Sequence, residues 1–294
     1  MTGRWRWPLR IAAFGYLALL VVVPVGWIFY RAFQHGFAAA WDAVTTPDAL
    51  HALWLTFLVV LIAVPLDTVF GVGVALILSR HRFPGAWLLD ALVDLPLAVS
   101  PVVVGIALIL VYGKTGWFGN WLDAHGIHII FSLPGIVMAS ATVALPYVVR
   151  EVLPVLQEIG TDQEQAATTL GASPFTVFRR ITLPSIRRSL AYGVTLTTAR
   201  VIGEFGAVVV VSGAVAGRTQ TFTLFIQDGV ENLDLVGAYA GSVILALFAL
   251  MVLAAVGADR KGRTDNDTER RKPRWPSPSA PSPSDSDLNL LSTT

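Results

Sequence analysis

The sequence predicts an all-α, polytopic membrane protein with six transmembrane helices, and two observations support this. Of its 294 residues, 54% are hydrophobic and only 14% are charged, whereas soluble globular domains carry about 25% charged residues. A membrane-spanning helix needs about 20 mostly apolar residues. Stretches of that kind occur at residues 11–33, 53–78, 88–112, 129–149, 190–212 and 236–257.

The placement of lysine and arginine predicts the orientation. If residues 1–10 are cytoplasmic, 17 of the 21 basic residues fall in cytoplasmic segments, and only Arg31, Lys114 and Arg218 fall in outer ones. Cytoplasmic loops of membrane proteins carry an excess of these residues. Both termini are therefore expected in the cytoplasm, before and after a membrane domain at 11–257. A loop within this domain, at about 150–190, is expected on the same side.

The first three spans have distinct features. The first is expected to be a helix and not a signal peptide, because its apolar stretch exceeds the 7–15 residues of a signal sequence. Asp67 follows Pro65 within the second. In the third, Pro96 and Pro101 predict a kink, and we expect the kinked helix to line a pore, although a purely structural kink is the alternative.

Several kinds of catalytic site are excluded. The chain has no cysteine, and its five histidines show no metal-ligand spacing. The sequence YGKTG at residues 112–116 lacks the glycine that a phosphate-binding loop carries five residues before its GK pair, since Leu108 stands there. The chain is therefore expected to be no enzyme, with no cofactor or metal of its own.

A polar segment, EQAATTLGASPFTVFRRITLP at residues 164–184, follows the fourth span. Residues 161–164 have capping-box spacing, which predicts a helix from Asp162, and Gly171 suits a left-handed helix end. Ser173 with the proline after it predicts the start of a second helix, and Pro184 is expected to end it.

This pair of short helices has two interpretations. Phe175, Phe178 and Ile181 recur every third residue and are expected near one face. They would fill the groove of a partner protein, or they would lie on the lipid surface as an amphipathic pair.

The segment resembles the EAA loop of bacterial ABC-importer permeases, whose pattern is Glu-Ala-Ala, three residues, Gly, nine residues, Ile, one residue, Leu-Pro. Gln165 stands at the position of the motif's Glu, and Glu164 beside it points about 100° away around the helix. In this family the loop docks into a separate ATPase subunit. The resemblance therefore implies these coupling residues: Gln165, Ala166, Ala167, Leu170, Gly171, Phe175, Phe178, Ile181, Leu183 and Pro184.

Three further stretches, DLPLAVSPVVVG (94–105), ALPYVVREVLP (144–154) and ARVIGEFGAVVVVSG (199–213), resemble sulfate and thiosulfate permeases, most closely the W-type subunit. The resemblance implies a type I ABC-importer permease fold in a bacterial cytoplasmic membrane. It also implies a heterodimer with a second permease, a dimer of ATP-binding subunits that hold ATP and Mg, and an extracytoplasmic sulfate-binding protein, with no nucleic acid. The alternatives are a molybdate or tungstate permease and a gradient-driven anion transporter.

Charges inside the fifth span mark a candidate anion path. Arg200 and Glu204 lie four residues apart, on one helix face, and charges in spans normally face a bundle interior or a water-filled cavity. Arg200 is expected to attract the anion and Glu204 to hold Arg200, together with Ser100 and Pro101 on the same path. The alternative is a structural ion pair.

The tail at residues 258–294 is rich in Pro and Ser and has no apolar period. We expect it to be disordered and its basic residues to rest near anionic lipid.

Overall fold

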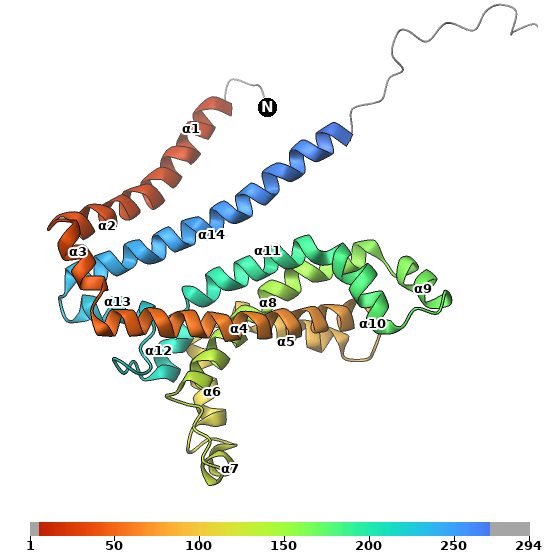
Figure 1. Ribbon diagram of the computed structural model, residues 1–294, viewed down its shortest axis with the longest axis horizontal. Helices are drawn as coiled ribbons and strands as arrows, with labels where there is room; N and C mark the ends of the chain where they lie inside the picture. The colour runs from red at the N-terminus through yellow and green to blue at the C-terminus, as the bar shows by residue number, and fades with distance from the viewer. Residues whose placement is uncertain (1–5, 271–294) are drawn as a thin grey trace, which may run out of the picture. The chain divides into compact units, whose positions relative to one another are not determined.

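Helices make up almost all of residues 6–270, the part of the chain that the computed structural model describes, and that part contains no strand (Figure 1). The all-α prediction is confirmed. The helices are α1 (Arg6–Leu17), α2 (Val23–Phe33), α3 (Phe37–Val44), α4 (Pro47–Arg80), α5 (Ala86–Ala98), α6 (Pro101–Tyr112), α7 (Gly119–Ala124), α8 (Leu133–Ile159), α9 (Asp162–Thr169), α10 (Pro174–Val177), α11 (Leu183–Ile202), α12 (Gly206–Ser212), α13 (Phe222–Glu231) and α14 (Leu235–Arg270). Two π-helical turns, Ala18–Val22 and Phe178–Thr182, join α1 to α2 and α10 to α11.

The chain divides into two units, Met1–Val252 and Leu253–Thr294. The second begins within α14, which is helical as far as Arg270. The predicted disordered tail lies largely beyond this point, and residues 271–294 are outside the described part of the chain. Disorder there stays a prediction.

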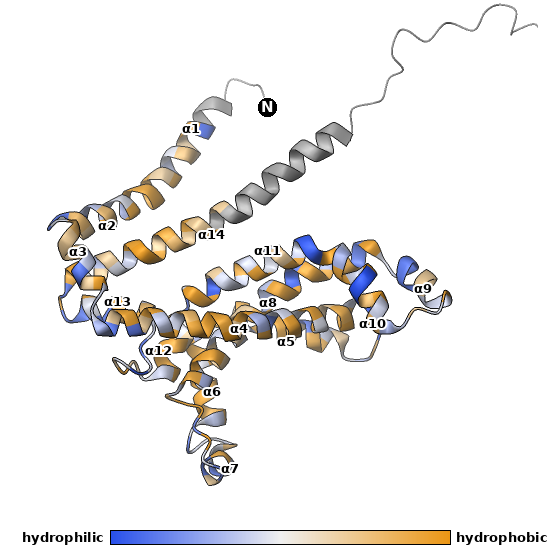
Figure 2. Cartoon of the chain, in the orientation of Figure 1, coloured by the Kyte–Doolittle hydropathy of each residue, from blue (hydrophilic) through white to orange (hydrophobic). Residues whose placement is uncertain are grey.

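Among the described residues, four helices are long and apolar enough to cross a membrane: Arg10–Phe33, Pro47–Arg80, Leu133–Ile159 and Leu235–Val252. Two bent pairs, α5 with α6 and the helix Pro174–Ile202 with α12, bring the number to six if each pair is one span. Figure 2 shows apolar residues along these helices. With each bent pair counted as one span, the described residues match the six predicted spans, two of them as broken helices.

The predicted kink in the third span is confirmed, and it is a sharp break. α5 and α6 meet at 116°. Ser100, between them, has an extended backbone with ψ of 135°, and Pro101 is the first residue of α6. A proline disfavours helical geometry in the residue before it, so the break at Ser100 follows from Pro101. Whether this element lines a pore stays a prediction.

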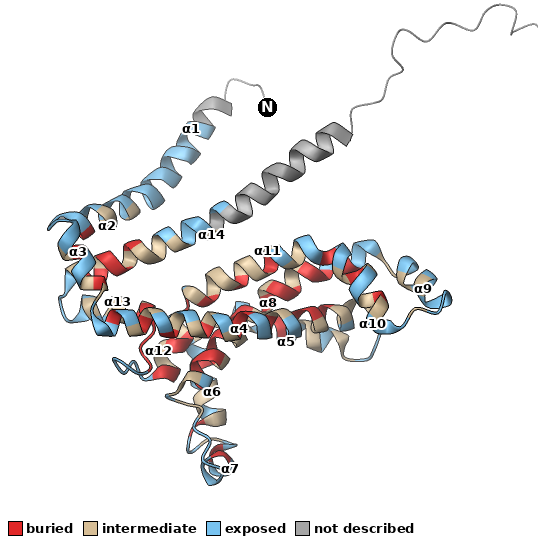
Figure 3. Cartoon of the chain, in the orientation of Figure 1, coloured by how far each residue is buried: buried red, intermediate tan, exposed pale blue. Residues whose placement is uncertain are grey.

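The core of the first unit lies between α4, α8 and α11, and Figure 3 shows buried residues along α4 and α8. Small residues let these helices approach closely, as is usual within membranes. A Cβ atom at Gly71 would lie 2.7 Å from Val148 Cβ, and one at Gly193 would lie 3.2 Å from Val148 Cα. By contrast, the most apolar stretch of the first span has no buried residue, which is the surface expected of a helix facing lipid.

Candidate functional site

The predicted pair of short helices is present at residues 162–177. α9 begins at Asp162 as predicted, and Gly171 has a φ of +85°, the left-handed conformation expected at the helix end. Ser173 caps α10, because its Oγ accepts a hydrogen bond from the Thr176 N–H at 3.4 Å, and Pro174 follows it. The local signals of the sequence therefore position this turn correctly.

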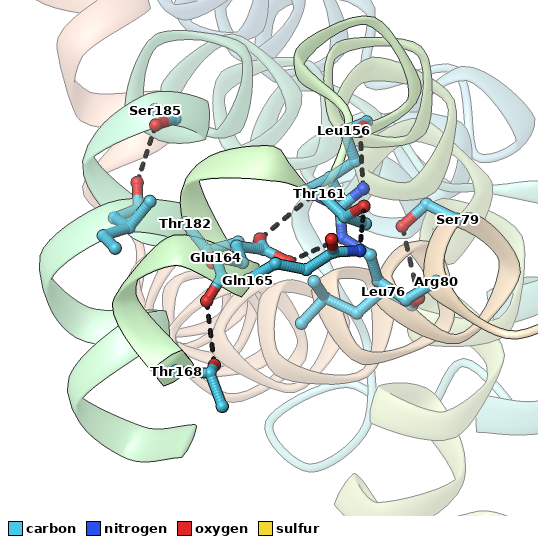
Figure 4. Close-up of polar contacts among 11 residues, drawn as sticks. Leu76, Ser79, Arg80, Leu156, Thr161, Glu164, Gln165, Thr168, Thr182 and Ser185 are labelled. Carbon is cyan, nitrogen blue, oxygen red and sulfur yellow. Dashed lines mark hydrogen bonds and ion pairs between the residues drawn. The ribbon is translucent and has the colours of Figure 1, made fainter. Parts of the chain in front are cut away.

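The capping box at residues 161–164 is not formed, and that part of the prediction is wrong. The Thr161 side chain caps no backbone N–H. Its Oγ1 instead accepts a hydrogen bond from Gln165 Nε2 at 2.9 Å (Figure 4). The Glu164 carboxylate, which a capping box would turn back to the Thr161 N–H, faces Arg80. Binding to a guanidinium in another helix outcompetes the local cap, because ion-paired hydrogen bonds are the stronger ones.

Pro184 does not end the second helix, contrary to the prediction. The helix runs without interruption from α10 through the π turn Phe178–Thr182 into α11, and Pro184 lies in the first turn of α11. In the π turn the N–H of Leu183 donates to the carbonyl of Phe178, five residues back. A proline normally clashes with the carbonyl four residues before it, and the wider π turn removes that conflict. The Ser185 hydroxyl, next in the same turn, donates to the Ile181 carbonyl at 2.6 Å.

The predicted coupling residues fall into two sets. One set is exposed: Gln165, Ala166, Leu170, Gly171, Phe175 and Pro184. The other is partly buried: Ala167, Phe178, Ile181 and Leu183. Phe178 and Leu183 pack against the cluster of α4, α8 and α11 residues around Val148. Leu170 and Phe175 are 89% and 71% exposed, so apolar surface for a partner comes from these two side chains.

The second candidate site lies at the break of the fifth span, a break that the sequence did not indicate. The predicted pair of Arg200 and Glu204 is present, with Nη1 2.6 Å from Oε2. The Glu204 side chain is 1% exposed and that of Arg200 is 28% exposed. Glu204 Oε1 also accepts from the Ala207 N–H at 2.8 Å, and its carbonyl accepts from Thr223 Oγ1 at 3.0 Å. Glu204 therefore holds Arg200 and at the same time caps α12.

The breaks of the third and fifth spans adjoin each other. A Cβ atom at Gly206, the first residue of α12, would lie 3.0 Å from Pro101 Cβ. Pro101 begins α6 and is partly buried, while Ser100 before it is exposed. The structure thus places Ser100 and Pro101 on one side of this junction and Glu204, with its partner Arg200, on the other.

One ion cluster was missed by the sequence analysis. Arg150 lies within α8 and contacts two carboxylates of α5. Its Nη2 lies 2.8 Å from Asp90 Oδ1 and 2.6 Å from Asp94 Oδ2, and its Nε donates to Asp94 Oδ1 at 2.7 Å. The signal available was the spacing of Asp90 and Asp94 by one helical turn, opposite a basic residue at the end of an apolar stretch.

Comparison with known proteins identifies the family. Residues 67–258 match the family described as "Binding-protein-dependent transport system inner membrane component". The chain belongs to this family. The permease is 45% identical over 252 residues to the sulfate transport system permease protein CysW of Synechocystis, a match that covers 86% of this chain and 91% of the relative. It is 46% identical to the CysW protein of Escherichia coli K12 over 236 residues, 80% of this chain and 81% of the relative.

A solved structure agrees on the fold. A chain of a bacterial alginate ABC transporter, crystallised in complex with an alginate pentasaccharide-bound periplasmic protein, superposes on the permease with a TM-score of 0.70. The match covers 86% of this chain and 92% of that chain, at 16% sequence identity. The fold is therefore that of an ABC-transporter membrane subunit, as predicted.

Proposed function

We propose that this permease is the membrane-spanning subunit of an ATP-driven importer that carries sulfate or thiosulfate into the cytoplasm. The observation that carries the proposal is the exposed α9–α10 turn. It sits at the spacing of the EAA loop, in a chain about 45% identical to CysW proteins over most of its length. Docking explains an exposed Leu170 and Phe175 beside a glycine turn, and a lipid-surface pair would leave the EAA spacing unexplained.

The coupling works through a separate ATPase. The ATPase dimer holds ATP and Mg, and its closing and opening displaces the α9–α10 turn. The distribution of basic residues supports a cytoplasmic position for this turn and both termini. This chain supplies no bond-breaking chemistry. It binds a dianion briefly and exposes it to one side of the membrane and then to the other.

The anion path runs past the junction of the two broken spans. A charge buried in a membrane is costly unless it is paired, and Arg200 is paired with Glu204 at 2.6 Å. A paired guanidinium attracts a dianion and still lets it leave, whereas an isolated one would retain it. Ser100 lies exposed at the other side of the junction, where a hydroxyl can donate a hydrogen bond to an oxyanion.

The partner permease of the heterodimer covers the exposed face of α6. Val103, Ile106 and Leu110 are 50%, 46% and 65% exposed on this helix. They form an apolar face after the 116° break. A sulfate-binding protein on the outer side delivers the anion to the interface between the two permeases.

Complementation of a sulfate-auxotrophic strain that lacks this chain and retains its partners tests the function. Uptake of labelled sulfate is expected to return with the chain, and thiosulfate is expected to compete. If sulfate uptake does not return and uptake of labelled molybdate does, the alternative of a molybdate or tungstate permease is correct. Uptake that persists when the ATPase cannot bind ATP would indicate the gradient-driven class.

A further inference from the structure

The coupling helix α9 has little apolar packing to hold it in place. None of its residues is buried, and its main neighbours are α10 and the π turn Phe178–Thr182. It has eight residues, and isolated helices shorter than about 12–15 residues are only marginally stable in water. The position of α9 therefore depends on polar contacts.

Glu164 makes these contacts (Figure 4). Arg80, the last residue of α4, holds both carboxylate oxygens: its Nη2 donates to Oε1 at 3.0 Å, and its Nε lies 2.9 Å from Oε2. Thr182 Oγ1 donates to the same Oε1 at 2.7 Å. Arg80 Nη1 donates to the Leu156 carbonyl of α8 at 2.9 Å. These four residues, which we name the Glu164 clamp, join α9 to α4, to α8 and to the π turn that leads into α11.

The Glu164 clamp is firmer than an ordinary surface ion pair. Exposed pairs contribute little because water screens them and both side chains must be ordered. Here the side chains of Arg80 and Glu164 are only 12% and 20% exposed, and Thr182 is 3% exposed. The guanidinium donates one charge-assisted hydrogen bond, from Nη2 to Oε1 at 3.0 Å, and its Nε lies in ion-pair contact with Oε2 at 2.9 Å.

The neighbouring Gln165 lies about 100° further around the helix. It is exposed, and its amide donates to Thr161 of the same turn. Adjacent residues of one helix thus have different roles. Gln165 is available to a docked ATPase, and Glu164 faces the core of its own chain.

We propose that the Glu164 clamp transmits the displacement of the coupling helix α9 to the core helices α4, α8 and α11. The proposal rests on the proposed function, since the ATPase supplies the displacement. With the clamp intact, α9 moves together with the ends of the three helices. Without it, α9 follows the ATPase alone, and ATP is hydrolysed without transport. Glu164 and Arg80 are positioning residues, and neither contacts the anion.

The test uses the whole complex in proteoliposomes: this chain, its partner permease, the ATPase dimer and the sulfate-binding protein. Sulfate uptake and ATP hydrolysis are measured in the same vesicles. For Glu164→Gln we expect the ratio of uptake to hydrolysis to fall by roughly tenfold or more, within the range of coupling between distant sites, while hydrolysis continues. Thr182→Val removes one hydrogen bond and is expected to lower the ratio less. Glu158→Gln, the loss of an exposed carboxylate in the last turn of α8, is the matched control and should leave the ratio unchanged.

A double variant separates transmission from general damage. Arg80→Glu with Glu164→Arg restores an ion pair in reversed polarity, and its ratio should exceed that of either single variant. If the Glu164→Gln complex does not assemble, the same comparison is made with Thr182→Val. A wild-type ratio in Glu164→Gln, or in Thr182→Val where that variant carries the test, overturns the proposal. Absence of ATP-dependent sulfate uptake by the wild-type complex would overturn the proposed function instead.

Discussion

Replacement of Arg200 by alanine is the sharpest perturbation of the proposed anion path. In the wild type, the charges of Arg200 and Glu204 cancel at 2.6 Å. Arg200→Ala leaves the Glu204 carboxylate, 1% exposed, as an uncompensated negative charge beside the junction of the broken spans. A dianion passing at ~8 Å would meet a repulsion of about 4 kcal/mol at an effective dielectric constant of ~20.

A barrier higher by about 4 kcal/mol corresponds to a rate lower by roughly a thousandfold. We therefore expect Arg200→Ala nearly to abolish labelled-sulfate uptake at normal membrane expression, measured in cells and normalised to the amount of permease in the membrane. The effect is on transport and not on assembly, so co-purification with the ATPase should be unchanged.

The second variant, Arg200→Ala with Glu204→Gln, checks this electrostatic reasoning. The glutamine retains an oxygen that can accept the Ala207 N–H bond, which is 2.8 Å in the wild type, and the site is neutral again. Uptake should recover substantially above that of Arg200→Ala. Uptake close to wild type in Arg200→Ala would refute the path role and leave a structural ion pair. A double variant no better than the single one would refute repulsion by Glu204 as the cause of the loss.

Three other substitutions test the α9–α10 turn and the core. Gln165→Glu restores the family's acidic residue at an exposed position, so we expect tighter association with the ATPase and unchanged thermal unfolding; equal affinity would mean that the charge is dispensable here. Gly171→Ala puts a Cβ on a residue with φ of +85°, at a cost of about 1–2 kcal/mol, and should weaken ATPase co-purification; unaltered binding would show that the turn tolerates the change. Gly71→Ala places a Cβ 2.7 Å from Val148 Cβ, and this overpacking costs about 1–3 kcal/mol. We expect it to lower the unfolding temperature of the permease in detergent. Gly73→Ala, with open space around residue 73, is the control and should leave the unfolding temperature unchanged.

Local signals in the sequence predicted what depends on local chemistry. Long apolar stretches located the spans because a bilayer demands length and hydropathy together. Gly171 and Ser173 predicted the α9–α10 turn because a left-handed residue and an N-cap act on the few residues next to them. The break at Ser100, the residue before Pro101, was predictable for the same reason.

Features that depend on residues far apart in the sequence could not be predicted from local signals. Glu164 looked like half of a capping box, but its partner Arg80 is 84 residues away in the sequence. Arg150 likewise meets Asp94 across 56 residues. The break at Glu204 has apolar residues next to it on both sides. Hydropathy therefore predicted one continuous span at residues 190–212. Pro184 was predicted to end the second helix because no single residue in the sequence indicates a π turn. The π turn before Pro184 lets the helix continue through it.

ATP-driven sulfate import is measured most directly as accumulation of labelled sulfate in proteoliposomes that contain the complete complex and binding protein, with ATP on the side of the ATPase. We predict accumulation that requires ATP, stops when the ATPase is replaced by a variant unable to bind ATP, and continues after ion gradients are collapsed. Accumulation that survives the loss of ATP binding and follows an imposed ion gradient would contradict ATP-driven import.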